Sequence, residues 1–127
     1  MKLDHARHNR DACDSFIQLG NYNDWVITTA FYSAIHFIDH KLFPLIDYRG
    51  RSVSDIGQFS KMEGVSKHEA RILIISLRLP SQNTNFGFLY NQCLTARYIN
   101  YHVSLETAEK AREKLRLIEE ECTNADD

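Results

Sequence analysis

This sequence of 127 residues has few prolines, few cysteines and no long apolar run. No stretch approaches the roughly 20 apolar residues that a membrane-spanning helix requires. The polar start of the chain does not fit a secretory signal. We therefore expect a cytoplasmic protein with no membrane partner. The sequence also lacks a glycine-rich phosphate loop and a local motif for serine or cysteine nucleophiles, which argues against those enzyme classes.

The three cysteines are odd in number and far apart: Cys13, Cys93 and Cys122. Each lies beside apolar residues in a helical pattern. This usage is typical of reduced thiols in or near a core, and it does not indicate a disulfide framework.

The net charge of −2 hides an uneven distribution. Residues 105–127 contain four basic and eight acidic side chains, whereas the rest of the chain is slightly basic. Such a balance would repel a polyanion from much of the surface, which argues against tight, nonspecific nucleic-acid binding but not against a small catalytic site. A role on nucleic acid would need a local basic cleft.

Helical periodicity dominates the chain, and no alternating run is long enough for a sheet. Five helices are expected, at about 3–19, 24–42, 66–79, 85–101 and 105–121. Short links between them predict an all-α, up-and-down bundle of four to five helices. We expect one domain over 4–121 and a disordered C-terminal tail over 122–127. Residues 44–65 form a long polar connection, of a kind that is usually functional or disordered.

Several residues mark the expected helix ends. Gly20 suits the position after the first helix. Ser66 and Glu69 form a capping box at the start of the third helix, and Ser104 is a good N-cap for the last. Three side chains are candidates for the cap of the second helix: Asn21, Asn23 and Asp24.

Arg97 and His102 form the most informative pair in the sequence. Arginine is a permanent cation shaped to grip phosphate, and histidine exchanges a proton readily near neutral pH. On one continuous helix the two side chains would diverge by about 140°. Cooperation therefore needs a break between them, which the cap at Ser104 supplies, or a second copy of the chain.

The order of several segments resembles the HEPN domain family over about residues 4–120. A leading helix is followed by Asp24-Trp25 and then by Phe31-Tyr32-Ser-Ala-Ile-His36. Lys67-His68-Glu69 comes after the loop, and Tyr90 with Ala96-Arg97-Tyr98 precedes a closing helix rich in Ala, Glu and Lys. The resemblance implies a four- to five-helix bundle that is often a homodimer.

The same resemblance implies a metal-independent endoribonuclease of toxin or defence type, with RNA as substrate and no cofactor. Arg97 and His102 fit the spacing of the family's arginine–histidine motif, which lies at the dimer cleft. His102 would act as general base on the ribose 2′-OH, and Arg97 would bind the phosphate. His36, Tyr90, Tyr98 and Tyr101 are expected as auxiliary or substrate-binding residues. A cognate antitoxin or nucleotidyltransferase is the implied protein partner.

Two positions depart from the family pattern. Tyr98 follows the motif arginine where a small polar residue is common. Ser104 stands where toxins paired with nucleotidyltransferase antitoxins have tyrosine, which argues against regulation by tyrosine modification.

Other readings of the sequence remain open. One is a noncatalytic HEPN module that binds a partner protein, nucleotide or RNA. Another is a metal-binding bundle resembling DinB-like proteins, because His36 and His40 are spaced as a ligand pair on one helix, although no third ligand has a telling spacing. The stripe of Tyr90, Cys93, Arg97 and Tyr101 fits either a base-stacking surface or a core or dimer seam.

Overall fold

The structure is a computed structural model that describes residues 2–124. Within this range it has six α-helices and one small antiparallel hairpin. Their bounds are α1 Lys2–Leu19, α2 Asn23–Leu42, β1 Leu45–Ile46, β2 Ser52–Val53, α3 Ile56–Glu63, α4 Lys67–Arg78, the 3₁₀ turn η1 Pro80–Gln82, α5 Asn83–Tyr98 and α6 Leu105–Asn124. The helical fold confirms the prediction from the sequence. The expected number of four to five helices and the expectation of no strands were wrong.

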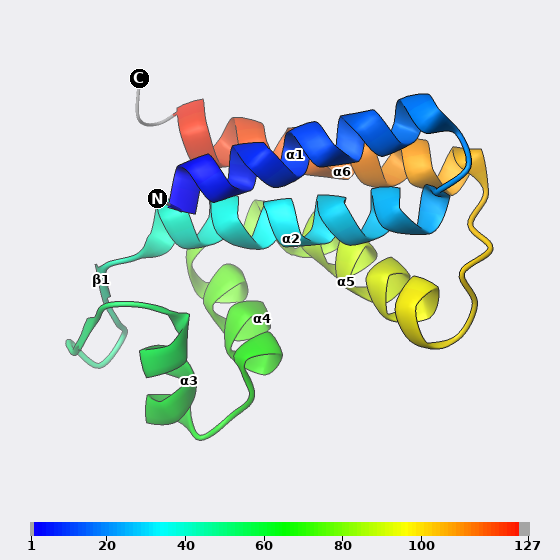
Figure 1. The fold of residues 1–127 in the computed structure, drawn as a ribbon. Coiled ribbons are helices and arrows are strands. Elements are labelled where there is room, and N and C mark those ends of the chain that lie inside the picture. Colours follow the sequence, from blue (N-terminus) through cyan, green and yellow to red (C-terminus); the bar gives the residue numbers. More distant parts are fainter. Residues whose placement is uncertain (1, 125–127) are drawn as a thin grey trace.

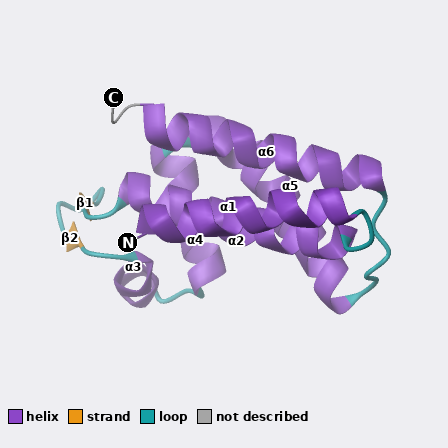
Figure 2. Cartoon of the chain, turned by 45° about the horizontal axis from the view of Figure 1, so that its top comes forward, coloured by secondary structure: helices purple, strands orange, loops and turns teal. Residues whose placement is uncertain are grey.

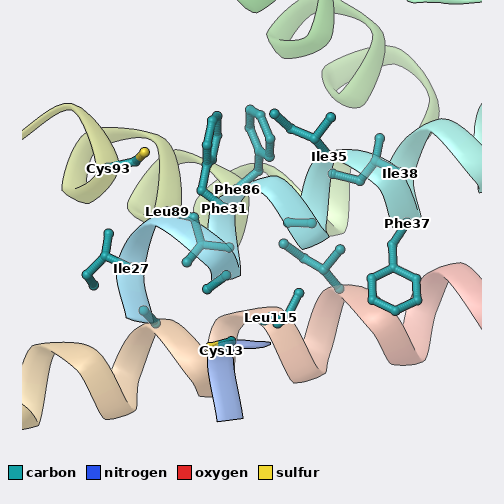
Figure 3. Packing of buried hydrophobic residues seen from close by; sticks show 14 of the residues in the cluster. Cys13, Ile27, Phe31, Ile35, Phe37, Ile38, Phe86, Leu89, Cys93 and Leu115 are labelled. Carbon is teal, nitrogen blue, oxygen red and sulfur yellow. The ribbon is translucent and has the colours of Figure 1, made fainter. Parts of the chain in front are cut away.

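Helix α2 is the centre of the fold and packs against α1, α5 and α6 (Figure 1). Its nearly continuous apolar sequence explains this position, because a helix that is apolar on most sides needs neighbours on most sides. Side chains of α2 such as Ile27 and Phe31 meet Cys13, Leu89 and Leu115 from the surrounding helices (Figure 3). Each fully buried side chain of this size contributes about 1.5–3 kcal/mol to folding.

The chain reverses direction between α1 and α2 and again between α5 and α6 (Figure 1). Gly20, with φ of +79°, makes the first reversal possible in three residues. Two ion pairs join α1 to α6: Arg10 with Glu119 at 2.7 Å and Arg112 with Asp14 at 2.5 Å. The outer helices are thus tied to each other as well as to α2.

The segment expected as a polar connection contains the hairpin and α3. Asp55 caps α3 by accepting the backbone N–H of Gln58, and Gly64 ends it with a left-handed backbone. Phe59 is fully buried in a small second core with Val53 and Ile74. Two-residue strands are too short to show alternation, and the three glycines around α3 masked its helical period.

The expected helix ends are largely confirmed. Ser66 accepts the backbone N–H of Glu69, and Ser104 accepts that of Thr107, each at 3.1 Å. Helix α5 ends at Tyr98, three residues earlier than expected. Helix α6 continues to Asn124, so residues 122–124 are helical and the expected tail does not begin at 122. Residues 125–127 lie outside the described residues.

The start of α2 differs from expectation. Tyr22 occupies the N-cap position and makes no side-chain cap hydrogen bond. The amide of Asn23 instead donates to the carbonyl of Val103 at 3.0 Å. The start of α2 is therefore joined to loop 99–104, at the end of the bundle that lies far from the hairpin (Figure 2).

Candidate functional site

Arg97 lies in the last turn of α5 and projects to the surface beside α2. Its Nη1 donates a hydrogen bond of 2.5 Å to the hydroxyl of Tyr32. The guanidinium also lies 5.9 Å from the Tyr32 ring centre and 5.6 Å from that of Tyr98. Tyr32 raises the pKa of Arg97 further above its already high ordinary value. Within residues 2–124, no carboxylate pairs with Arg97, so its charge is oriented without being neutralised.

His102 lies in the loop 99–104 that follows α5, as the expected break requires. Its ring centre is 4.2 Å from that of Tyr101, and its backbone N–H donates to the side chain of Asn100. The side chain is exposed. The end of the loop nearest α6 is held by the bond from Asn23 to Val103 and by the Ser104 cap. The other end is held by the backbone N–H groups of Ile99 and Asn100, which donate to the carbonyl of Thr95.

Arg97 and His102 do not meet within one chain. In the described part of the chain no hydrogen bond joins them, and His102 lines none of the three hollows that Arg97 lines. One of these hollows, of about 260 Å³, reaches from Arg97 to Tyr101 and Trp25. Loop 99–104 therefore reaches Arg97 through Tyr101, while the imidazole of His102 stays outside this hollow.

A second group of polar side chains does meet Arg97. An open groove of about 370 Å³ lies between α1 and α2 and includes Arg97 in its lining. Its lining residues are His5, Asn9, Trp25, Thr28, Thr29, Tyr32, His36 and Arg97. The expected auxiliary residue His36 thus shares a groove with Arg97, whereas His102 does not.

His36 and His5 stack face to face across the α1–α2 contact. Their ring centres are 3.8 Å apart and the planes differ by 22°. Burial lowers the pKa of His36, and the neighbouring His5 lowers it further. His36 is therefore mainly neutral near pH 7 and available to accept a proton.

The tyrosines expected at the site fall into two groups. Tyr90 is half-buried and packs against Phe31, Phe86 and His68, so it belongs to the core side of its stripe. Tyr98 and Tyr101 are 72% and 66% exposed. Along α5 and the loop after it, the tyrosine before Arg97 therefore packs on the core, and the two tyrosines after Arg97 lie on the open surface.

A metal centre gains no support from the arrangement of ligands. No group of three or more His, Cys, Asp or Glu side chains in residues 2–124 is placed to hold a metal ion. His36, one member of the expected pair with His40, stacks on His5 instead.

The cysteines offer no nucleophile at the groove. Cys13, Cys93 and Cys122 are reduced and buried, as the sequence predicted. Burial raises the pKa of Cys13 to about 11 and raises that of Cys93 as well.

Sequence reasoning missed Tyr32 and His5 as members of the site. The signal for Tyr32 was present, since Trp25, Thr29, Tyr32 and His36 follow each other at three or four residues and share one face of α2. The role of His5 had no such signal, because it depends on how α1 packs against α2.

Comparison of the chain with models of protein families, with curated proteins and with solved structures finds no match. No helix within residues 2–124 is long and apolar enough to cross a membrane.

Proposed function

We propose that this protein is a metal-independent endoribonuclease of HEPN type that acts as a homodimer. The observation that carries the proposal is the exposed, uncompensated guanidinium of Arg97, oriented by Tyr32 at the edge of a groove. An oriented arginine without a carboxylate partner is suited to bind a phosphodiester in bidentate fashion.

The surface around this arginine supports a dimer. Tyr98, Ile99, Tyr101 and Leu105 are each more than half exposed and cluster in sequence around the His102 loop. Exposed apolar side chains gathered in this way are typical of interaction surfaces. Two copies that meet here would juxtapose two Arg97/His102 sites, so that His102 of the partner subunit supplies what the single chain does not place beside Arg97.

The chemistry follows from the two side chains. His102 takes the proton of a ribose 2′-OH, and the resulting oxygen attacks the adjacent phosphorus. Arg97 stabilises the negative charge that develops on the phosphate oxygens. The bond to the 5′-oxygen breaks, and a protonated histidine gives its proton to that oxygen. The products are a 2′,3′-cyclic phosphate and a 5′-hydroxyl, and DNA is inert because it lacks the 2′-OH.

The test is cleavage of single-stranded RNA by purified protein in excess EDTA. Arg97→Ala and His102→Ala should each reduce the rate at least about a hundredfold, within the range of a lost acid–base or oxyanion contact. Arg116→Ala is the matched control, since Arg116 is exposed on α6 and pairs with Glu113 and Glu120. Cleavage that persists equally in both site variants would overturn the proposal.

The dimer is tested separately by sedimentation. Ile99, 80% exposed, should lie in the contact between subunits. Ile99→Asp should give monomers and lose cleavage, while the unfolding midpoint stays near that of the wild type. A monomeric wild type with full activity would contradict the dimer.

A noncatalytic HEPN module is the second candidate. The same exposed residues, together with Trp25 at 50% exposure, also suit a partner protein. On this hypothesis neither the wild type nor any variant cleaves RNA. The protein instead forms a stable complex with a cognate protein, such as an antitoxin or a nucleotidyltransferase. Tyr98→Asp or Ile99→Asp should disrupt that complex.

A further inference from the structure

The groove between α1 and α2 has an order of chemical groups along its length. On α2, Trp25, Thr29, Tyr32 and His36 succeed one another at intervals of about one helical turn, or 5.4 Å. Arg97 reaches the groove through its bond to the Tyr32 hydroxyl. His5 stacks on His36 one turn beyond Tyr32. The groove therefore holds an aromatic surface toward one end, a cation near its middle and a histidine pair toward the other end.

The side chains that line the groove include one cation, Arg97, and two histidines, His5 and His36. No carboxylate lines it within the described residues. The acidic neighbour of His36 is Asp39, which is buried and bonded to Arg71 at 3.0 Å. The titratable and charged groups that face His36 are Lys2 and His5 from α1, Asp39 from α2 and Arg71 from α4. Asp39 is paired with Arg71, and Asp24 lies in the adjoining hollow beside Arg97. An anion at the histidine end of the groove therefore has the cation Lys2 nearby and, in the part of the chain that the structure describes, no unpaired lining carboxylate.

Two imidazoles stacked at 3.8 Å disfavour being protonated together, because like charges at that separation repel. An anion beside the pair offsets part of this repulsion. It gives each protonated ring an acceptor, and a charged hydrogen bond to an anion is stronger than a neutral one. The pair is therefore a place where anion binding and proton uptake are linked.

We infer that His5 and His36 form a second phosphate subsite, which binds the phosphodiester next to the one held by Arg97. This inference rests on the proposed function for the identity of the ligand as a single-stranded nucleic acid. The strand lies along the groove, with one phosphate at Arg97, the next at the histidine pair and a base against Trp25. Aromatic side chains of this kind stack bases without sequence preference.

The sign of the pH dependence follows from the protonation states. Above pH 7 His36 is mainly neutral, because burial and His5 lower its pKa. Binding of a phosphodiester, which stays anionic throughout pH 5–8, stabilises the protonated ring and raises that pKa. Affinity for the second phosphate therefore increases as the pH falls from 8 to 6, by at most about tenfold per pH unit for one proton.

The experiment compares a deoxythymidine dinucleotide, with one phosphodiester, and the trinucleotide, with two. Neither is cleaved, and thymine does not titrate between pH 5 and 8. Trp25 is the one tryptophan of the sequence, so its fluorescence reports on this groove. The trinucleotide should bind about tenfold more tightly at pH 6, as expected for one added charged contact, with a smaller gain at pH 8.

His5→Asn and His36→Gln should each remove the gain, so that the trinucleotide binds no more tightly than the dinucleotide to the same variant. His8→Asn is the matched control, because His8 lies one turn along α1 and does not line the groove. Thermal unfolding checks that each variant is folded, and the ring signals of His36 in NMR spectra should titrate at higher pH with the trinucleotide bound. A gain that persists in both site variants, or that is equal at pH 6 and pH 8, overturns the subsite.

The outcomes separate this inference from the proposed function. Loss of RNA cleavage with the trinucleotide gain intact removes the nuclease and keeps the subsite. Cleavage without any trinucleotide gain removes the subsite and keeps the nuclease. Absence of binding by both nucleotides overturns the subsite directly.

Discussion

The hydroxyl of Tyr32 and the guanidinium of Arg97 are joined by a hydrogen bond of 2.5 Å between α2 and α5. A neutral hydroxyl orients the arginine but leaves its full charge for a ligand. A carboxylate in the same place would compete with phosphate. The Tyr32 hydroxyl thus orients the guanidinium of Arg97 without neutralising its charge.

Tyr32→Phe removes this orientation and keeps the aromatic ring beside the arginine. We expect affinity for single-stranded RNA and the cleavage rate to fall about tenfold, since hydrogen bonds to charged groups are worth about 1.5–3 kcal/mol. Stability should change little, because Tyr32 is 37% exposed. Binding, cleavage and urea unfolding measure the three quantities. Tyr22→Phe, at a tyrosine that does not line the groove, is the control, and equal effects of the two substitutions would contradict the prediction.

The buried ion pair of Asp39 and Arg71 joins α2 to α4, and we expect it to contribute to stability. The two residues are 7% and 9% exposed, and their charged atoms are 3.0 Å apart. Arg71→Met leaves a buried carboxylate unpaired and should lower the free energy of unfolding by about 3–5 kcal/mol. The double variant Asp39→Leu/Arg71→Met should recover most of this loss.

Urea unfolding measures both variants. Arg116→Met serves as the comparison, since that arginine is paired on the exposed face of α6 and should change stability by less than about 1 kcal/mol. A single variant at Arg71 that is as stable as the wild type would show that the pair does not hold α4 in place.

Two histidines, the half-buried His36 and the exposed His68, give the folded state a dependence on pH. Burial is the main cause that lowers the pKa of both His36 and His68, and Arg71 contributes to each. Above about pH 6.5 both are neutral in the folded and unfolded states. Below that value the unfolded chain takes up protons more readily, so the free energy of unfolding should fall between pH 7.5 and 5.5.

Urea midpoints at these two pH values test the prediction. The double variant His36→Gln/His68→Gln should show a flatter dependence. Asp47 and Glu113 do not interfere, because their pKa values lie below the ordinary carboxylate range and they act at lower pH. If the free energy of unfolding of the double variant changed with pH as steeply as that of the wild type, groups other than these two histidines would be responsible.

The sequence predicted the helices of the bundle because their signals are local. Ser66 and Ser104 cap their helices through side chains that reach three residues ahead, and such contacts depend on nothing distant. The break between Arg97 and His102 was predictable for the same reason. Asn23 was one of three candidates for the cap of α2, and its actual role was not predictable because its partner, Val103, is 80 residues away.

The site was only partly predictable. The sequence indicated Arg97 from its chemistry and His36 as an auxiliary residue, and both line one groove. The packing of α1 on α2 decides that His5 stacks on His36, and no spacing along the chain reports that contact. Whether His102 serves Arg97 depends on a second copy, which a single sequence does not encode as a local pattern.

The segment between α2 and α4 packs on a small core of its own under the hairpin, which it shares with α4. Phe59, Val53 and Ile56 are buried among themselves and Ile74, apart from the side chains that surround Ile27 and Leu115. The segment between α2 and α4 can therefore change in length or sequence during evolution. The helices that carry Tyr32 and Arg97 would keep their spacing. Related proteins would then differ most in size and surface at the hairpin end, and least in the distance between arginine and phenol.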